Sequence, residues 1–177
     1  MTKIAYFAGG CFWCTESIFQ RIKGVIEVVP GYMGGHVKNP AYREVCNGNT
    51  GHAETIKVLY NKGWVSYDEL LEIFFLTHDP TSLNRQGNDV GSQYRSAIFY
   101  NNLDEKNQIV DCINRLEKEA VFDNPILTEI NTECTFYTAE IEHHNYYNRN
   151  TEQPYCQFLI TPKIKKFNSI FNPYTTS

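Results

Sequence analysis

A nearly continuous apolar run over residues 3–8 is the feature that most restricts the fold of this chain. Such a run is typical of a central strand that is covered on both faces. Gly9 and Gly10 interrupt it, and the segment that follows has apolar side chains at helical spacing. Those side chains are Cys11, Cys14, Ile18 and Ile22. The pattern predicts a strand that enters a helix through a glycine turn.

The elements after this unit repeat the alternation of strands and helices. Ser66 and Glu69 form a capping box that opens a helix ended by Pro80, and Asn102 or Asp104 caps another. That second helix carries Ile109, Ile113, Leu116 and Ala120 on one face. Strands are expected at 25–29, 55–61, 94–100, 126–131 and 135–138, one helical turn at 42–46, and a helix at 141–149. The first six elements read β-α-β-β-α-β, which predicts an α+β fold, a two-layer sandwich with a ferredoxin-like, split βαβ core.

Length and composition favour one folded domain. The chain has 177 residues, so we expect a single catalytic domain with its core at about 3–163 and a weakly patterned tail at 164–177. Hydrophobic residues make up 42% and charged residues 20%, which excludes disorder, collagen and coiled coil. A formal charge of −4 predicts no general attraction to nucleic acid or acidic membranes. No run approaches the roughly 20 apolar residues of a membrane helix.

The chain has six cysteines but only two methionines. The cysteines are too sparse for a small disulfide-stapled scaffold. Only ten residues precede Cys11, too few for the parts of an export signal. We therefore expect a cytoplasmic location, where thiols are more often catalytic or buried than bridged.

Cys11 lies where the glycine turn meets the helix. The free backbone N–H groups and the positive end of the helix dipole there predict a thiolate, and so a nucleophile. The alternative is a small buried side chain at a tight turn. Cys14 completes a Cys-x-x-Cys pair, which also suggests dithiol–disulfide exchange. A zinc site would need two further ligands, for which Cys134 and His143 are irregularly spaced candidates.

The chain resembles the A-type peptide methionine sulfoxide reductases in a series of motifs that occur in the family's order. The resemblance runs from about Ala5 to Lys163. The motifs are Gly9-Gly10-Cys11-Phe12-Trp13, Gly31-Tyr32 with Gly34-Gly35, Asn39-Pro40 with Tyr42, Val45 and Gly48, Thr50-Gly51-His52-Ala53-Glu54, Phe74-Phe75, His78-Asp79-Pro80-Thr81, the stretch from Asn84 to Ser96, and Ile98-Phe99-Tyr100. The resemblance implies a two-layer α+β sandwich and the reduction of methionine-S-sulfoxide, free or in proteins, to methionine. It also implies no bound metal or organic cofactor, and thioredoxin as the source of electrons.

The resemblance also implies roles for residues that would otherwise be unremarkable. Sulfoxide reduction needs a thiol nucleophile, a proton donor at the oxygen and an apolar slot for the methyl group. Cys11 matches the nucleophile, and Glu54 matches the acid, whose pKa must be raised by burial for that task. The remaining matches are Tyr42 and Tyr94 at the sulfoxide oxygen, Phe12 and Trp13 around the methyl group, and Asp89 beside the site.

A second thiol should then condense with the sulfenic acid formed on Cys11. Cys156 matches the family's usual resolving position and is favoured, with Cys14 as the alternative and a relay through both as a third reading. Cys46, Cys112 and Cys134 are expected to be buried filler, and His143-His144 a solvated pair. The tail after Cys156 lacks the glycine-rich stretch and last cysteine of some members. We expect a monomer.

Overall fold

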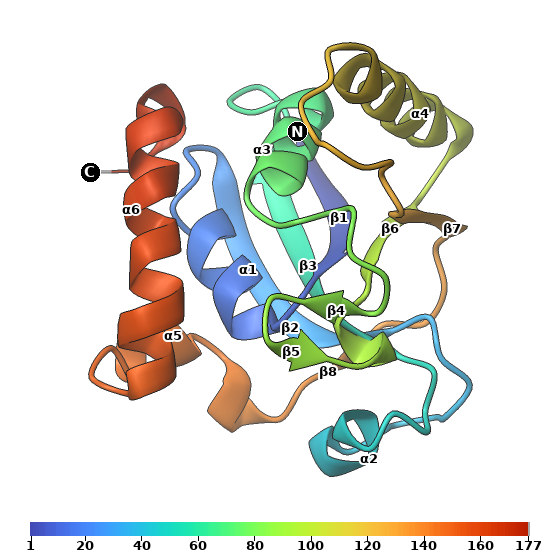
Figure 1. The fold of residues 1–177 in the computed structure, drawn as a ribbon, viewed down its shortest axis with the longest axis vertical. Helices are drawn as coiled ribbons and strands as arrows, with labels where there is room; N and C mark the ends of the chain where they lie inside the picture. Colours follow the sequence, from blue (N-terminus) through green and yellow to red (C-terminus); the bar gives the residue numbers. More distant parts are fainter. Residues whose placement is uncertain (177) are drawn as a thin grey trace.

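The computed structural model describes residues 1–176, built around a six-stranded sheet with the order β7-β6-β1-β3-β2-β8 (Figure 1). The strands are β1 Thr2–Gly9, β2 Val25–Met33, β3 Ala53–Asn61, β4 Arg85–Gln86, β5 Asp89–Val90, β6 Ser96–Tyr100, β7 Glu129–Thr132 and β8 Tyr137–Thr138. The α-helices are α1 Phe12–Phe19, α2 Tyr42–Cys46, α3 Tyr67–Leu76, α4 Leu103–Lys118, α5 Tyr146–Arg149 and α6 Thr161–Ile170. Short 3-10 turns are η1 Ser92–Tyr94, η2 Ile141–His143 and η4 Asn172–Tyr174, and η3 Cys156–Ile160 is a π-helix.

The apolar run that opens the chain forms β1, in the middle of the sheet. β1 pairs antiparallel with β3 on one side and with β6 on the other, and Phe7 lies opposite Ile56 and Ile98. β2 completes the central group by pairing antiparallel with β3. It continues to Met33, beyond the predicted end at residue 29, because its pairing with β3 runs to Ala53. The result is a mixed α/β architecture with helices against a mostly antiparallel sheet.

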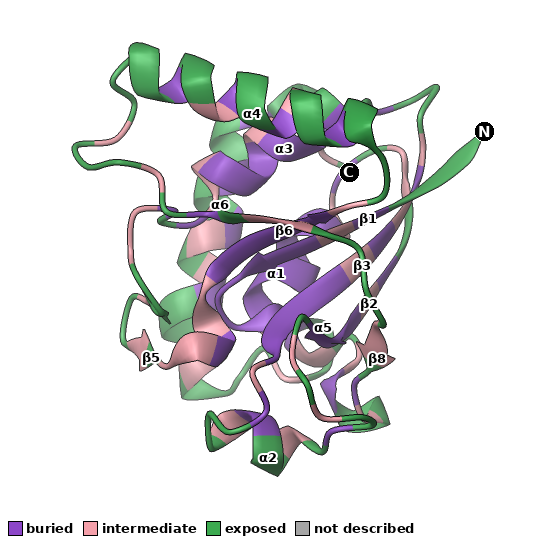
Figure 2. Cartoon of the chain, turned by 90° about the vertical axis from the view of Figure 1, so that its right-hand side faces the viewer, coloured by how far each residue is buried: buried purple, intermediate pink, exposed green. Residues whose placement is uncertain are grey.

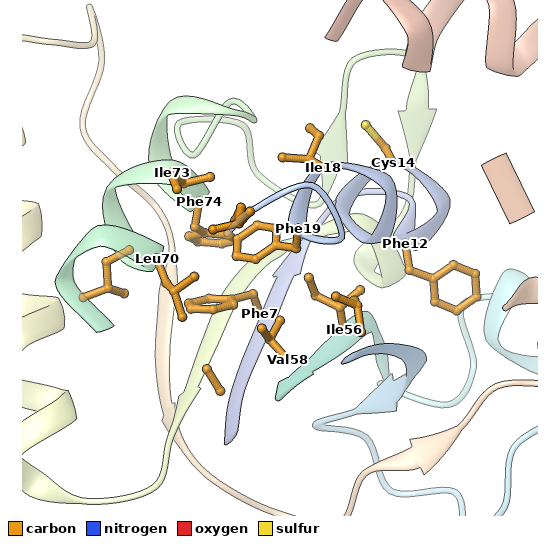
Figure 3. Close-up of a cluster of buried hydrophobic side chains, with 14 of the residues drawn as sticks. Phe7, Phe12, Cys14, Ile18, Phe19, Ile56, Val58, Leu70, Ile73 and Phe74 are labelled. Carbon is orange, nitrogen blue, oxygen red and sulfur yellow. The ribbon is translucent and has the colours of Figure 1, made fainter. Parts of the chain in front are cut away.

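Side chains of α1, α3, α4 and α6 join one buried cluster with the sheet. Figure 2 shows the buried segments of the sheet and of these helices in purple, and Figure 3 shows side chains of the cluster from α1, α3 and the central strands. Phe7 is at its centre and stacks on Phe74 of α3 at 5.1 Å between ring centroids. A smaller cluster forms from the strand side chains of opposite parity: Ala8, Met33, Ala53, Ala97 and Phe99, with Phe136 packed against them. Both sides of β1 are thus covered at this end, as its unbroken apolar run predicts.

The helix predicted from the Ser66 capping box is confirmed at its start. The Ser66 hydroxyl accepts from the Glu69 N–H at 3.1 Å, and the Glu69 carboxylate accepts from the Ser66 N–H at 2.7 Å. The helix ends at Leu76, earlier than the proline that was expected to stop it. The next residue, Thr77, bonds its hydroxyl to the Ile73 carbonyl at 2.7 Å, which satisfies one of the free carbonyls of the last turn.

Two predictions about helices are wrong. Ala120 does not lie on the apolar face of α4, because that helix ends at Lys118 and Ala120 is exposed with φ at +52°. The segment 141–149 is not one helix either, because Asn145 adopts φ of +55° between η2 and α5.

The tail at 164–177, expected to be weakly patterned, contains most of α6. The buried side chains in and beside this helix are Ile160, Ile164, Phe167 and Phe171, which follow one another at intervals of four, three and four residues. That spacing is an amphipathic helix pattern. Pro162 lies in the first turn of α6, where a proline is compatible with a helix start. Among residues 1–176, no helix has the length and apolar character needed to cross a membrane.

Candidate active site

Gly10 allows the turn that places Cys11 at the start of α1. Its φ is +97°, and a Cβ there would lie 2.7 Å from the Gln86 side chain. Cys11 is the N-cap residue of α1 and is buried. Burial and the nearby Glu54 carboxylate raise the pKa of the Cys11 thiol well above its usual value. The Trp13 N–H and the Tyr155 hydroxyl act in the opposite direction but do not outweigh them. The prediction of a thiolate at rest is therefore wrong.

Glu54 extends from β3 beneath the start of α1 and is almost completely buried. One carboxyl oxygen, Oε1, accepts from the Phe12 N–H at 3.0 Å, and the other, Oε2, has no hydrogen-bond partner. Burial, with a smaller contribution from the charge of Asp89, raises the pKa of Glu54 to about 8. The carboxyl is therefore protonated at neutral pH, and its Oε2 is free to donate.

Tyr42 at the start of α2 and Tyr94 at the end of η1 come from the two long polar loops. Both are half-buried, and burial followed by the charge of Glu54 raises the pKa of each phenol. Cys11 contributes to both shifts as well. The structure therefore brings both tyrosines close to Glu54 and Cys11, and it keeps both hydroxyls protonated.

Aromatic rings surround the first turn of α1. The Phe12 ring stacks on Tyr42 at 6.4 Å and the Trp13 ring on Tyr146 at 3.8 Å. Trp13 Nε1–H donates to His143 Nδ1 at 3.1 Å, and the His143 ring lies 4.2 Å from that of Tyr42.

His143 was expected to be solvated, and that prediction is wrong. The ring is buried, and burial lowers its pKa. Its role in holding Trp13 follows from η2, a turn that brings the residue 130 positions along the chain to α1. His144 is half-buried and bonds the Ala139 carbonyl through Nε2 at 2.8 Å.

Asp89 is held by Tyr155, a residue that the sequence analysis did not single out. The Tyr155 hydroxyl donates to Asp89 Oδ2 at 2.7 Å, and its ring meets Trp13 edge-on at 5.8 Å. The same hydroxyl is a hydrogen-bond neighbour of the Cys11 sulfur. Its position directly before Cys156 was the available signal.

The two candidate resolving thiols are both buried, and all six cysteines are free. Cys14 lies on α1, and its N–H bonds the Cys11 carbonyl at 3.1 Å. Figure 3 shows the Cys14 and Phe12 side chains leaving α1 in different directions. Cys156 is fully buried, and after burial it is the charge of Cys14 that raises its pKa. The thiols of Cys14 and Cys156 are therefore neighbours.

Two other cysteines differ from the prediction of buried filler. Cys134 is exposed, because it lies in the irregular segment between β7 and β8. Cys46 is only partly buried and lies next to the Tyr42 hydroxyl. Cys112 is buried on α4, as predicted. Within residues 1–176, no three His, Cys, Asp or Glu side chains gather as they would around a metal ion, so the zinc candidates are not assembled.

Two cavities lie beside each other near α6. A small one of about 90 Å³ is lined by both cysteines of the Cys-x-x-Cys pair together with Asp89, Tyr155 and Lys163. A larger one of about 340 Å³ lies between α3 and α6 and contains none of the predicted site residues. Lys163 and Gln86 line both.

A buried carboxyl with a raised pKa beside a buried thiol, with tyrosine hydroxyls and aromatic rings around them, is an arrangement suited to a thiol-based oxidoreductase. Comparison with known proteins agrees. The family model described as peptide methionine sulfoxide reductase matches residues 3–174. The chain is 48% identical to the peptide methionine sulfoxide reductase MsrA of Saccharolobus solfataricus, over 96% of this chain and 94% of that protein.

Solved structures share the fold. The reduced form of Mxr1 from Saccharomyces cerevisiae matches with a TM-score of 0.79 and 32% identity, over 88% of this chain and 89% of that one. Mxr1 in complex with Trx2 matches with a TM-score of 0.56 and 24% identity, over 82% and 84% of the two chains. The chain belongs to the peptide methionine sulfoxide reductase family.

Proposed function

We propose that this enzyme reduces methionine-S-sulfoxide, free or within proteins, to methionine, with Cys11 as the nucleophile and Glu54 as the acid. The observation that carries the proposal is the Glu54 carboxyl, which is buried, has a pKa near 8 and keeps one oxygen without a partner beside Cys11. A sulfoxide becomes a good electrophile only when its oxygen receives a proton or a strong hydrogen bond. The unpartnered Oε2 is suited to supply it.

In the first step, the Cys11 sulfur attacks the sulfoxide sulfur while Glu54 protonates the oxygen. Tyr42 and Tyr94 hold that oxygen, and Phe12 and Trp13 enclose the methyl group. The hydroxyl then passes from the methionine sulfur to the Cys11 sulfur, so one S–O bond breaks and another forms, and the S–S bond made by the attack breaks as methionine leaves. The proton that the Cys11 thiol loses replaces the one that Glu54 gave. The products are methionine and a Cys11 sulfenic acid.

The resting thiol form of Cys11 is compatible with this step. The Trp13 N–H and Tyr155 hydroxyl stabilise the thiolate once it forms. Glu54 raises the pKa of Cys11 only in its charged form, so a protonated Glu54 leaves burial as the main cost of ionising the thiol. A protonated Glu54 therefore allows Cys11 to ionise and also supplies the proton that the sulfoxide oxygen needs.

In the second step, a resolving thiol attacks the Cys11 sulfenic acid, a disulfide forms and water leaves. Cys156 and Cys14 are the two candidates. Thioredoxin then reduces the disulfide. Mxr1 has been solved with Trx2 bound, and the family implies this reductant. The mechanism as proposed uses no bound metal or organic cofactor.

The test is turnover of separate S and R epimers of a methionine sulfoxide substrate with dithiothreitol as reductant. We expect turnover of the S epimer alone and none in Cys11→Ser. Equal turnover of both epimers, or full activity in Cys11→Ser, would contradict the proposal.

The alternative function is general dithiol–disulfide exchange through Cys11 and Cys14, favoured only by their spacing. It predicts fast insulin reduction that Cys14→Ser abolishes. The sulfoxide reductase predicts that Cys14→Ser still releases one equivalent of methionine in a single turnover.

The proposal also includes expectations about the fold, the oligomeric state, the location and the partners. The central strands, in the order β6-β1-β3-β2 with antiparallel neighbours, support classing the core as a ferredoxin-like split βαβ. We further propose one catalytic domain over 1–177, a monomer, a cytoplasmic location, and partners limited to sulfoxide substrates and thioredoxin. Sedimentation at several concentrations would test the monomer.

A further inference from the structure

Lys163 is the cation of the small cavity beside the active site. It is half-buried on α6, seven residues and about two helical turns after Cys156. It lines the cavity together with Cys11, Cys14, Asp89 and Tyr155. Helix α6 packs against α1 in this region, so a residue of the last helix reaches the thiols of the first.

The three buried thiols do not have equal neighbours. Cys11 has Glu54 and Cys14 beside it, and Cys156 has Cys14. Cys14 alone has a cation among these neighbours: it lines the small cavity together with Lys163, and the Lys163 charge opposes the burial that raises the pKa of the Cys14 thiol. Asp89, from β5, opposes this effect weakly. Thiolate and not thiol attacks a sulfenic acid, so a cation beside one thiol favours attack by that thiol.

We propose that Lys163 is a positioning residue that makes Cys14, rather than Cys156, the first thiol to attack the Cys11 sulfenic acid. This inference rests on the proposed function. The Cys14 thiolate, paired with the ammonium, attacks the Cys11 sulfur. An S–S bond forms, the S–O bond breaks, and the departing hydroxide takes up the proton that Cys14 had released to solvent. Cys156, next to Cys14, then exchanges into that disulfide.

The chain offers a clear chemical readout for the order of the thiols. Trypsin cleavage after Lys3 and Arg21 leaves Cys11 and Cys14 in one peptide, and cleavage after Arg149 places Cys156 in another. A Cys11–Cys14 bridge is therefore internal to one peptide, and a bridge to Cys156 joins two. Samples quenched in acid and alkylated at successive times after mixing with one equivalent of sulfoxide give the order.

The experiment compares the wild type with Lys163→Met, Lys163→Arg and the matched control Lys166→Met, which alters another lysine of α6. Methionine release and formation of the first disulfide are timed separately across pH 6–9. We expect Lys163→Met to release methionine normally but to form the disulfide at least tenfold more slowly at pH 7. Its pH midpoint should rise by one unit or more. Lys163→Arg and Lys166→Met should resemble the wild type.

Two results would overturn the inference: a first disulfide that joins Cys11 to Cys156 in the wild type, or an unchanged rate and pH midpoint in Lys163→Met. Failure of the proposed function looks different, because the wild type would then release no methionine. If Lys163→Met were misfolded, it would fail to release methionine as well. The rate of disulfide formation in Lys163→Arg and the order of the disulfides in the wild type would then test the inference.

Discussion

The two sides of Cys11 have opposite electrostatic character. On the side of Glu54, Tyr42 and Tyr94, burial raises the pKa of each acidic group and keeps it protonated. Within the described residues, no lysine or arginine charge lowers these three pKa values. On the side of Cys14, the charge of Lys163 from α6 opposes the burial that raises the pKa of the thiol. The two half-reactions have opposite needs, a proton donor first and a thiolate second. The start of α1 separates the two environments by about one helical turn.

The largest expected effect tests whether methionine release and disulfide formation both depend on the Cys11 sulfur. Cys11→Ser should abolish methionine release and disulfide formation together, because a hydroxyl at this site is a far weaker nucleophile. Cys134→Ser, at an exposed position, is the matched control and should keep full activity. Methionine is measured by chromatography after one turnover. Release of methionine by Cys11→Ser would show that Cys11 is not the nucleophile.

Glu54→Gln should break the acid side alone. Gln keeps the acceptor for the Phe12 N–H but cannot protonate the sulfoxide, so methionine release should slow by about 10²–10⁴-fold. The circular dichroism spectrum should be unchanged. Sulfenic acid that does form should resolve at the normal rate, since Cys14 lies on the other side. An unchanged single-turnover rate would refute the role of Glu54.

The pH dependence should divide in the same way. The pKa of Glu54 is raised to about 8, so the acid is protonated below that pH, and methionine release should fall about tenfold per unit above it. Disulfide formation should instead rise with pH until Cys14 is ionised. Stopped mixing with separate detection of the two products measures both. Parallel profiles for the two steps would contradict separate environments.

The smallest expected effect concerns Tyr155, which contacts both sides. Tyr155→Phe keeps the ring against Trp13 but loses the hydroxyl that bonds Asp89. We expect the free energy of unfolding to fall by about 1.5–3 kcal/mol, the value of a hydrogen bond to a charged group. Methionine release should slow only a few-fold. Urea unfolding measures the change in stability. A loss of activity as large as in Glu54→Gln would contradict the small effect expected for Tyr155.

The sequence allowed the first half of the fold to be predicted because its signals are local. The apolar run of β1, the glycine turn and the Ser66 cap each specify a neighbouring element. Cys11 and Glu54 were predicted as site residues from motifs in a known order, although they meet only when β3 lies beside β1. Proximity of that kind depends on strand pairing and has no local pattern.

The sequence did not predict what the C-terminal segment does. His143 and Tyr155 reach the site through irregular turns, so neither periodicity nor spacing places them there. Lys163 follows a π-helix, where the change of pitch alters which face its successors present. The resting state of Cys11 was also misjudged, because the helix start favours a thiolate while burial, which the sequence does not show, favours the thiol.

The central claim is that Glu54 is a protonated acid at neutral pH. The most direct measurement is the carbon-13 chemical shift of the Glu54 side-chain carboxyl, titrated from pH 4 to 10 in the reduced enzyme. Glu54→Gln assigns the signal. The account predicts a single midpoint near pH 8. A midpoint near 4.5, the ordinary value for glutamate, would contradict it.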